Sequence, residues 1–410
     1  MTDNAAAFGA LSGIKIIDLT QMLAGPFGTM LLADHGATVI KVEPPVGDLT
    51  RPGGPFRDDD TQRVLGGYFQ SVDRNKYSIC LDLKTERGRE AFKQLVRDSD
   101  AVVENFRAGV MERLGLGYEV LREINPRLVY GALRGFGDAR TGASPYLDWP
   151  AFDVVAQAMG GIMAITGPDQ ATPTKVGPGV GDIIPGMMLG FGVLAAVYHA
   201  KSTGVGQFVD VAMTDAVLAV CERTIWQNSV QGLVPGPEGN HHPFLCPFGM
   251  FPAKDGFVTI AAQQDVFFPI LCRQLDAPEL STDSRFSDRE VRKANRLVLI
   301  ELVSARTRKF TKAELMKRLG GKIPFGPVMD ITDVLNDEHF KVREMLVDVE
   351  NPGTAPVTIA GVPIKMTHTP GQVARRAPIL GEHTRQLLLD AGVSESEVEL
   401  IMLESVPVKF

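Results

Sequence analysis

Short apolar runs rich in β-branched residues recur along the first half of the chain, and stretches with helical periodicity separate them. Runs of this length and composition predict buried strands. Strands that alternate with helices in this way are typical of a parallel α/β sheet. The expected strands are residues 14–19, 38–43, 78–83, 101–105, 128–133 and 207–213, and the expected helices are about 20–36, 85–100, 153–160 and 214–231.

Prolines, glycines and aromatic residues gather at residues 232–256, and this change predicts a linker. We divide the chain into a large α/β domain that starts with residues 1–231, the linker, a smaller α+β domain at 257–335, and a return segment at 336–410 that rejoins the large domain. The expected elements after the linker are a strand at 257–262, helices at 265–275, 289–310 and 311–321, extended runs at 323–331, 345–350 and 358–366, and helices at 384–391 and 394–403.

The stretch 176–201 combines a glycine-rich approach, a single carboxylate and a long apolar run. Asp182 follows three closely spaced glycines, and Pro185 stands where a first helical turn tolerates a missing N–H. We expect Asp182 to cap a buried helix and to be kept ionised by backbone donors and the helix dipole. One interpretation is that Asp182 only caps the helix. The other is that the glycine-rich approach lets a ligand come close to backbone amides at this point.

The uncharged apolar run at residues 183–198 is shorter than the roughly 20 residues of a membrane span. The net charge of −7 argues against a nucleic-acid-binding protein. The four cysteines show neither CxxC pairs nor zinc-like spacing, and the N-terminus has no basic region typical of a secretory signal. These features favour a cytoplasmic protein with reduced cysteines.

Several common catalytic and nucleotide-binding motifs are missing from the sequence. No GxGxxG follows the first strand, and neither GxxxxGK[ST] nor GxSxG is present. The adjacent His241 and His242 lack partners at the spacings of metal sites, so we expect no metal.

Basic residues recur at or after the expected strand ends in the first half of the chain. Ligands of open α/β sheets bind beyond the carboxyl ends of the strands, and lysine and arginine bind phosphate. The basic residues are either partners of a phosphate-rich ligand or a solvated surface. They are Lys41, Arg51, Arg74, Lys76, Lys84, Arg107, Arg113 and Arg134.

A family resemblance emerges from several segments that occur in order along the chain. Their combination resembles the class III coenzyme A transferases of the CaiB/BaiF type, which include formyl-CoA transferase and carnitine-related enzymes. The segments are GIKIIDLTQMLAGPFGTMLLADHGATVIKVEPPVGDLTR (13–51), NKYSICLDLKTERGRE (75–90), VVENFRAGVMERLGLGYEVLREINPRLVY (102–130), GVGDIIPG (179–186), IPFGPV (323–328) and LGEHT (380–384).

This resemblance implies a Rossmann-like large domain with an inserted small domain, and two chains interlocked as rings in a homodimer. It also implies that Asp182 is the nucleophile of a CoA transfer that passes through an aspartyl anhydride and an aspartyl-CoA thioester. Covalent catalysis of this kind conserves the thioester energy. Coenzyme A is then a co-substrate, and no tightly bound cofactor is expected. Succinyl-CoA is the expected donor.

The resemblance also implies the contacts of coenzyme A, segment by segment. The expected positions are Leu23, Ala24, Leu81, Asp82, Leu83, Lys84, Asn105, Phe106, Arg107, Arg113, Pro150, Ala151, Phe152 and Asp153. The sequence departs from formyl-CoA transferase in two places: Pro44 replaces an arginine, and residues 240–249 replace a tetraglycine loop. We therefore do not transfer formyl or oxalate specificity to this chain.

Two other functions fit the same resemblance. An α-methylacyl-CoA racemase pairs a histidine with the aspartate for two-base proton exchange. Phe152 occupies that histidine position here, and a phenyl ring transfers no proton. A catalytically silent CoA-binding protein is the second alternative, and the presence of Asp182 between its glycines argues against it.

Overall fold

A computed structural model describes residues 9–405 of the chain. Residues 1–8 lie outside the described residues, so the prediction that the N-terminus is not a secretory signal falls largely outside them. By their internal contacts the described residues form two compact units: the described parts of the first are residues 9–162, 175–232 and 339–405, and the second consists of residues 163–174 and 233–338.

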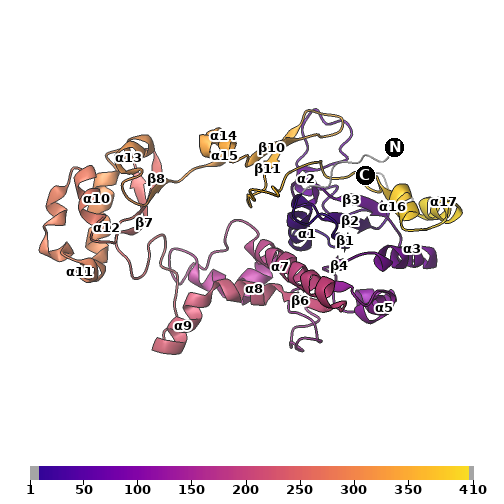
Figure 1. Ribbon diagram of the computed structural model, residues 1–410. Helices are drawn as coiled ribbons and strands as arrows, with labels where there is room; N and C mark the ends of the chain where they lie inside the picture. The colour runs from indigo at the N-terminus through magenta and orange to yellow at the C-terminus, as the bar shows by residue number, and fades with distance from the viewer. Residues whose placement is uncertain (1–8, 406–410) are drawn as a thin grey trace. The chain divides into compact units, whose positions relative to one another are not determined.

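A six-stranded parallel sheet is the centre of the first unit, in the order β3-β2-β1-β4-β5-β6 (Figure 1). This is the order of doubly wound nucleotide-binding folds, although the glycine fingerprint of dinucleotide binding is missing. The predicted parallel α/β sheet is confirmed, and β3 ends three residues earlier than expected. The strands are β1 (Lys15–Asp18), β2 (Thr38–Glu43), β3 (Tyr77–Cys80), β4 (Ala101–Glu104), β5 (Val129–Arg134) and β6 (Phe208–Ala212).

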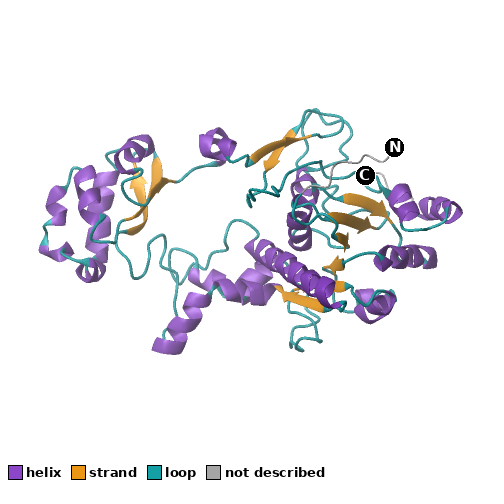
Figure 2. Ribbon diagram, viewed as in Figure 1, coloured by secondary structure: helices purple, strands orange, loops and turns teal. Residues whose placement is uncertain are grey.

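Helices cover both faces of this sheet, because successive strand residues point to opposite sides (Figure 2). Ile17 and Val102 pack in one core with helices α3, α5, α16 and α17, whereas Ile16 and Val103 pack in the other with α1, α7 and α8. The helices of this unit are α1 (Ala24–Asp34), α2 (Gly67–Asp73), α3 (Glu86–Arg97), α4 (Val110–Arg113), α5 (Tyr118–Ile124), α6 (Asp153–Met159), α7 (Val180–Thr203), α8 (Met213–Val220), α9 (Glu222–Gln231), α16 (Thr384–Asp390) and α17 (Glu395–Glu404).

Helix α7 is longer and less enclosed than the sequence indicated. It spans 24 residues, and by length and composition alone it is apolar enough to cross a membrane. However, 44% of its most apolar 18-residue stretch is buried inside the protein. Leu189 and Val193 pack against the sheet, as in the core helix of an α/β fold, while Phe191 and Tyr198 are each 76% exposed. The expectation of a buried helix therefore holds only for the side of α7 that meets the sheet.

Two long helices expected from the sequence are each divided in two. The stretch 214–231 forms α8 and α9, which meet at Cys221, and the stretch 289–310 forms α11 (Arg289–Ala294) and α12 (Arg296–Thr307), which meet at Asn295. Apolar periodicity continues through both breaks, so it did not reveal them.

The second unit contains a three-stranded antiparallel sheet and a cluster of short helices around one core. Strand β7 lies inside the stretch that was expected to be a linker and pairs with β8 along its whole length. The elements here are β7 (Phe248–Ala253), β8 (Gly256–Ala261), β9 (Phe325–Pro327), α10 (Phe268–Gln274), α11, α12, α13 (Lys312–Leu319) and α14 (Ile331–Asn336); α15 (Glu338–Val342) and the pair β10 (Leu346–Val349) and β11 (Val357–Ala360) follow.

Candidate active site

The strand order reverses between β1 and β4, and the loops that follow these two strands meet there. The Gln21 amide N–H donates to the Asn105 side-chain oxygen at 2.8 Å, and the Asn105 side-chain nitrogen donates to the Gln21 carbonyl at 2.8 Å. This pair of bonds ties the β1–α1 turn to the loop after β4. Open α/β sheets bind their ligands at such a point.

Asp182 lies in the first turn of α7, but it does not cap the helix. The helix begins at Val180. Its N-cap residue is Gly179, which has no side chain to accept a capping hydrogen bond. The Asp153 carboxylate, from the start of α6, instead accepts a 2.8 Å hydrogen bond from the Gly181 N–H. The expected capping role of Asp182 is therefore wrong, because a residue remote in sequence already satisfies a helix-terminal donor.

The Asp182 carboxyl group is also less acidic than expected. Burial, and then the negative charge of Asp153, raise its pKa to about 6. Gln157 holds that neighbouring carboxylate through two contacts of 3.0 Å from its side-chain nitrogen. Asp182 is thus ionised at neutral pH but close to its titration range, so desolvation and a second acid outweigh the helix dipole that was expected to dominate.

A cavity of about 330 Å³ brings Asp182 together with most of the predicted coenzyme A contacts. Its wall is formed by the β1–α1 turn, the loop after β4, the end of β5 and the segment before α6. The predicted residues that line it are Leu23, Ala24, Asn105, Phe106, Arg107, Arg113, Pro150, Ala151, Phe152 and Asp182. Asp153, the remaining predicted contact near Asp182, does not line the cavity. It accepts the hydrogen bond from Gly181, the residue before Asp182.

A second cavity of about 300 Å³ contains the rest of the predicted contacts. It shares Gln21, Phe106 and Arg113 with the first cavity, so the two are neighbours along one edge of the sheet. Pro44, the departure noted in the sequence, also lines it. The predicted residues found only here are Leu81, Asp82, Leu83 and Lys84.

The basic residues of the first half divide into two groups, and only one is available to a ligand. Lys84, Arg107 and Arg113 are exposed, and none of them forms an ion pair within residues 9–405. The others are buried against acidic partners, so neither interpretation, a phosphate partner or a solvated surface, describes them; they are Lys41, Arg51, Arg74, Lys76 and Arg134. Arg134 lines the first cavity with its guanidinium already paired to Glu104 and Asp138.

Several residues that line the first cavity were not singled out in the sequence. Gln21 and Met22 follow the end of β1, a position that a prediction from strand ends alone would have found. Tyr68 comes from α2, where no strand end marks it, and burial and then the charge of Asp182 raise the pKa of its phenol. The unpredicted lining residues are Gln21, Met22, Tyr68, Ala108, Leu133, Gly135, Leu147, Asp148, Trp149 and Met213.

Metal ligands do not gather at this site. Across residues 9–405, no three histidine, cysteine, aspartate or glutamate side chains are grouped so that they would hold a metal ion. His241 lies in the second unit, where its ring meets the edge of Phe251 at a centroid distance of 5.1 Å.

Comparison with known proteins gives consistent matches along nearly the whole chain. Residues 11–384 match the sequence profile of CoA-transferase family III. The chain is 49% identical over 386 residues to a succinyl-CoA:mesaconate CoA-transferase of Haloarcula hispanica, with 94% of this chain and 97% of the relative covered. It is 36% identical over 399 residues to a succinate–glutarate CoA-transferase of Agrobacterium fabrum, with 96% and 99% covered.

The fold matches solved structures as well. A CaiB/BaiF family protein of Brucella suis superposes with a TM-score of 0.84 at 34% sequence identity, and the match covers 94% of this chain and all of the other. The mixed α/β fold with a central parallel sheet is therefore shared with that protein.

Proposed function

Because the chain belongs to CoA-transferase family III, we propose that it moves coenzyme A from succinyl-CoA to a small dicarboxylic acid. The observation that carries this proposal is the position of Asp182, in the cavity at the strand-order reversal and beside the loops after β1 and β4. The names of relatives support the substrates, since they pair succinyl-CoA or succinate with mesaconate, glutarate or D-citramalate. Mesaconate is the first acceptor to test.

In the proposed mechanism Asp182 is the nucleophile of the first step and carries the acyl group or coenzyme A in the steps that follow. Its carboxylate attacks the donor thioester, the C–S bond breaks, and an acyl–aspartyl anhydride and CoA thiolate result. The thiolate attacks the Asp182 carbonyl, so the donor acid leaves and Asp182 carries coenzyme A as a thioester. The acceptor carboxylate attacks that thioester to give a second anhydride, and the thiolate then takes the acceptor acyl group and restores Asp182.

The surroundings of Asp182 suit this chemistry. A pKa of about 6 leaves the carboxylate ionised at neutral pH and more basic than an ordinary aspartate, which favours nucleophilic attack. Apolar side chains such as Leu23 and Met213 reduce the access of water, which would hydrolyse an anhydride.

Coenzyme A is proposed to extend from the Asp182 cavity into the neighbouring one. The unpaired guanidinium groups of Arg107 and Arg113 offer fork-shaped partners to its phosphates. The segment 81–84 lines the far cavity, with the exposed Lys84 at its end. Pro44 in that wall lacks the side chain that an arginine would stack on the adenine.

We further propose an interlocked cytoplasmic homodimer, in which residues 163–174 and 233–338 are the inserted smaller domain. The exposed apolar side of α7, α8 and α9 supports a second copy as its cover, because apolar patches of this kind mark interaction surfaces. All four cysteines are free and buried, as in a reducing compartment.

The racemase alternative gains no support from the cavity. Phe152, at the position of the catalytic histidine in racemases, is 64% exposed and lines the cavity with Asp182. The cavity therefore presents Asp182 without a histidine partner among its lining residues. Deuterium incorporation at the α-carbon of a branched acyl-CoA would be the result that favours a racemase.

The test of this proposal is the Asp182→Ala variant, assayed with succinyl-CoA and mesaconate and by mass spectrometry for a covalent CoA adduct. The wild type is expected to show the adduct, and the variant to lose it together with at least about a thousandfold in kcat. Asp215→Ala is the matched control, since Asp215 is likewise the third residue of its helix, α8, and does not line the cavity. Full transferase activity of Asp182→Ala would refute the mechanism, and a wild type that binds coenzyme A but forms neither adduct nor product would favour a silent CoA-binding protein.

A further inference from the structure

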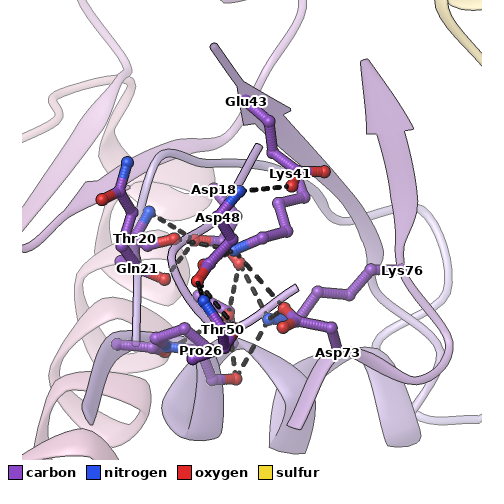
Figure 3. Close-up of polar contacts among 12 residues, drawn as sticks. Asp18, Thr20, Gln21, Pro26, Lys41, Glu43, Asp48, Thr50, Asp73 and Lys76 are labelled. Carbon is purple, nitrogen blue, oxygen red and sulfur yellow. Dashed lines mark hydrogen bonds and ion pairs between the residues drawn. The ribbon is translucent and has the colours of Figure 1, made fainter. Parts of the chain in front are cut away.

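Five buried charged side chains form a network beside the turn that follows β1 (Figure 3). Lys41 pairs with Asp48 at 2.9 Å and with Asp73 at 3.5 Å. Lys76 pairs with Asp18 at 2.9 Å and with Asp73 at 2.8 Å. Burial opposes these charges, but Lys76 and Lys41 hold the pKa of Asp18 at about 2. Buried ions are costly unless they are paired, so a network of this size calls for a reason.

The network bonds directly to the backbone of the turn. The Lys41 ammonium donates to the Thr20 carbonyl at 2.7 Å, and the Asp18 carboxylate accepts from the Thr20 N–H at 2.9 Å. The Met22 N–H donates to Asp48 Oδ1 at 3.4 Å. The same oxygen accepts from the Thr50 N–H and hydroxyl at 2.9 and 2.8 Å, which orients the carboxylate.

Met22 adopts a backbone conformation that a side chain disfavours. Its φ of +68° lies in the left-handed region, where a residue with a Cβ is strained unless its surroundings enforce the geometry. The Met22 N–H faces Asp48 Oδ1, to which it donates. The next residues, Leu23 and Ala24, line the cavity with Asp182, so the strained residue sets the direction of the backbone that enters the site.

We propose that the Lys41–Asp48 pair is a positioning device that holds Met22 in its left-handed conformation and thereby places the β1–α1 turn against Asp182. Asp48 serves both neighbours because its two oxygens accept separately: Oδ2 pairs with Lys41, while Oδ1 accepts from Met22 and Thr50. An asparagine has one acceptor oxygen and would turn its NH₂ group toward one of these donors. Positioning residues of this kind act on the reacting geometry and touch no substrate.

The kinetic test rests on the proposed transferase function. In Asp48→Asn, kcat for CoA transfer should fall about ten- to a hundredfold, since small displacements of reacting groups cost that much. KM for succinyl-CoA should change less than kcat, because Arg107 and Arg113, the proposed phosphate partners, lie outside the turn that carries Leu23 and Ala24. Met22→Gly removes the penalty for a positive φ, so Asp48→Asn should cost less than about threefold in kcat when introduced into the Met22→Gly background. Equal losses in both backgrounds would overturn the proposal.

Asp34→Asn is the matched control for the loss of a buried carboxylate. Asp34 is fully buried, and both of its oxygens accept from Arg74, at 3.0 and 2.7 Å, at the other end of α1. It should lower the thermal unfolding midpoint and leave kcat within about twofold of wild type. A fall in kcat as large as that of Asp48→Asn would mean that any buried charge has this effect. If Asp48→Asn does not fold, Thr50→Val weakens the orientation of Asp48, and the same dependence on Met22→Gly is expected.

A second measurement does not depend on the function. In a crystal structure of Asp48→Asn, Met22 should leave the left-handed region or its turn should change conformation, while in Asp34→Asn it should stay. Met22 unchanged in Asp48→Asn would overturn the inference whatever the activity. A wild-type protein that transfers no coenzyme A would instead refute the proposed function, and the crystal structure would still decide the role of Asp48.

Discussion

Asp182 and Asp153 form a pair of neighbouring acids whose environments differ. Asp153 accepts hydrogen bonds from Gly181 and Gln157, which stabilise its charge. Asp182 accepts none within the described residues, and burial followed by the charge of Asp153 raises its pKa to about 6. The structure therefore separates a carboxylate that orders the helix start from one that remains free to react.

The first prediction concerns the pH dependence of activity. The nucleophile must be ionised, so kcat/KM should be lost as the pH falls through about 6, the pKa of Asp182. Asp153→Asn removes the neighbouring charge and should move this limb to lower pH. The pH profile of kcat/KM for both proteins, measured from pH 4.5 to 8, checks this; an unchanged limb in Asp153→Asn would exclude the coupling.

The second prediction concerns stability. Between the ordinary pKa of 3.8 and the raised value of about 6, the folded protein keeps a proton that the unfolded chain has released. The free energy of unfolding should therefore fall over this range as the pH rises, and the full decrease should be reached above about pH 6. Two pKa units correspond to about 3 kcal/mol, and partial exposure reduces this to about 1–2 kcal/mol. Asp182→Asn should raise the free energy of unfolding by that amount at pH 8 and leave it unchanged at pH 4, as denaturant titrations would measure.

At the scale of elements, the site depends on how closely α1 and α7 approach each other. A Cβ atom on Gly186 would lie 2.2 Å from the Ala24 carbonyl oxygen, and one on Gly28 would lie 2.3 Å from the Gly186 carbonyl oxygen. These contacts involve backbone atoms, which cannot move aside as a flexible side chain can. Glycines on facing helices thus bring Ala24 and Asp182, which both line the cavity, to the same place.

The third prediction tests this approach. Gly186→Val should separate the two helices, lower the free energy of unfolding by about 3 kcal/mol or more as overpacking does, and reduce kcat. Gly177→Ala is the control, because nothing lies within 4 Å of the Cβ it would add. Thermal unfolding and steady-state kinetics of both variants give the comparison. A Gly186→Val protein as stable as Gly177→Ala would show that the helices tolerate a wider spacing.

At the scale of the whole molecule, the first unit exposes many apolar side chains on α7, α8 and α9, which we call the α7–α9 surface. Helix α7 exposes Phe191 and Tyr198, and α9 exposes Trp226, which is 48% exposed. Monomeric proteins seldom keep such a surface in water. The other apolar residues of this surface are Met187, Met188, Leu218, Val220, Ile225 and Val230.

The fourth prediction is that this surface is covered by a second chain. Phe191→Glu should shift the protein from dimer to monomer or prevent soluble expression, since a charge would be buried without a partner. Val120→Glu changes an exposed apolar residue of α5, away from this surface, and should stay dimeric. Light scattering coupled to gel filtration measures both. A dimeric and active Phe191→Glu variant would place the interface elsewhere.

Part of the site was predictable because it follows local rules. Asn105 and Phe106 come directly after a buried strand, and Leu23 and Ala24 come after another, so the parallel sheet places them at one edge. The sequence prediction took these contacts and the segment 81–84 from the family resemblance, and the structure places 81–84 and Phe106 in the second cavity. Tyr68 was not predictable, since its position depends on where α2 packs.

The sequence by itself determined the order of the elements, the parallel sheet and the presence of one carboxylate among glycines, because apolar periodicity and glycine placement act over a few residues. Only the tertiary structure decided what the charges do. Lys41 and Lys76 could be phosphate ligands in the sequence, but both are buried and each pairs with an acid far along the chain, Asp73 for Lys41 and Asp18 for Lys76. Likewise Asp182 looked like a helix cap until Asp153, 29 positions earlier, was found to satisfy the helix start. Burial and ion pairing depend on residues brought together by folding, and local pattern does not contain them.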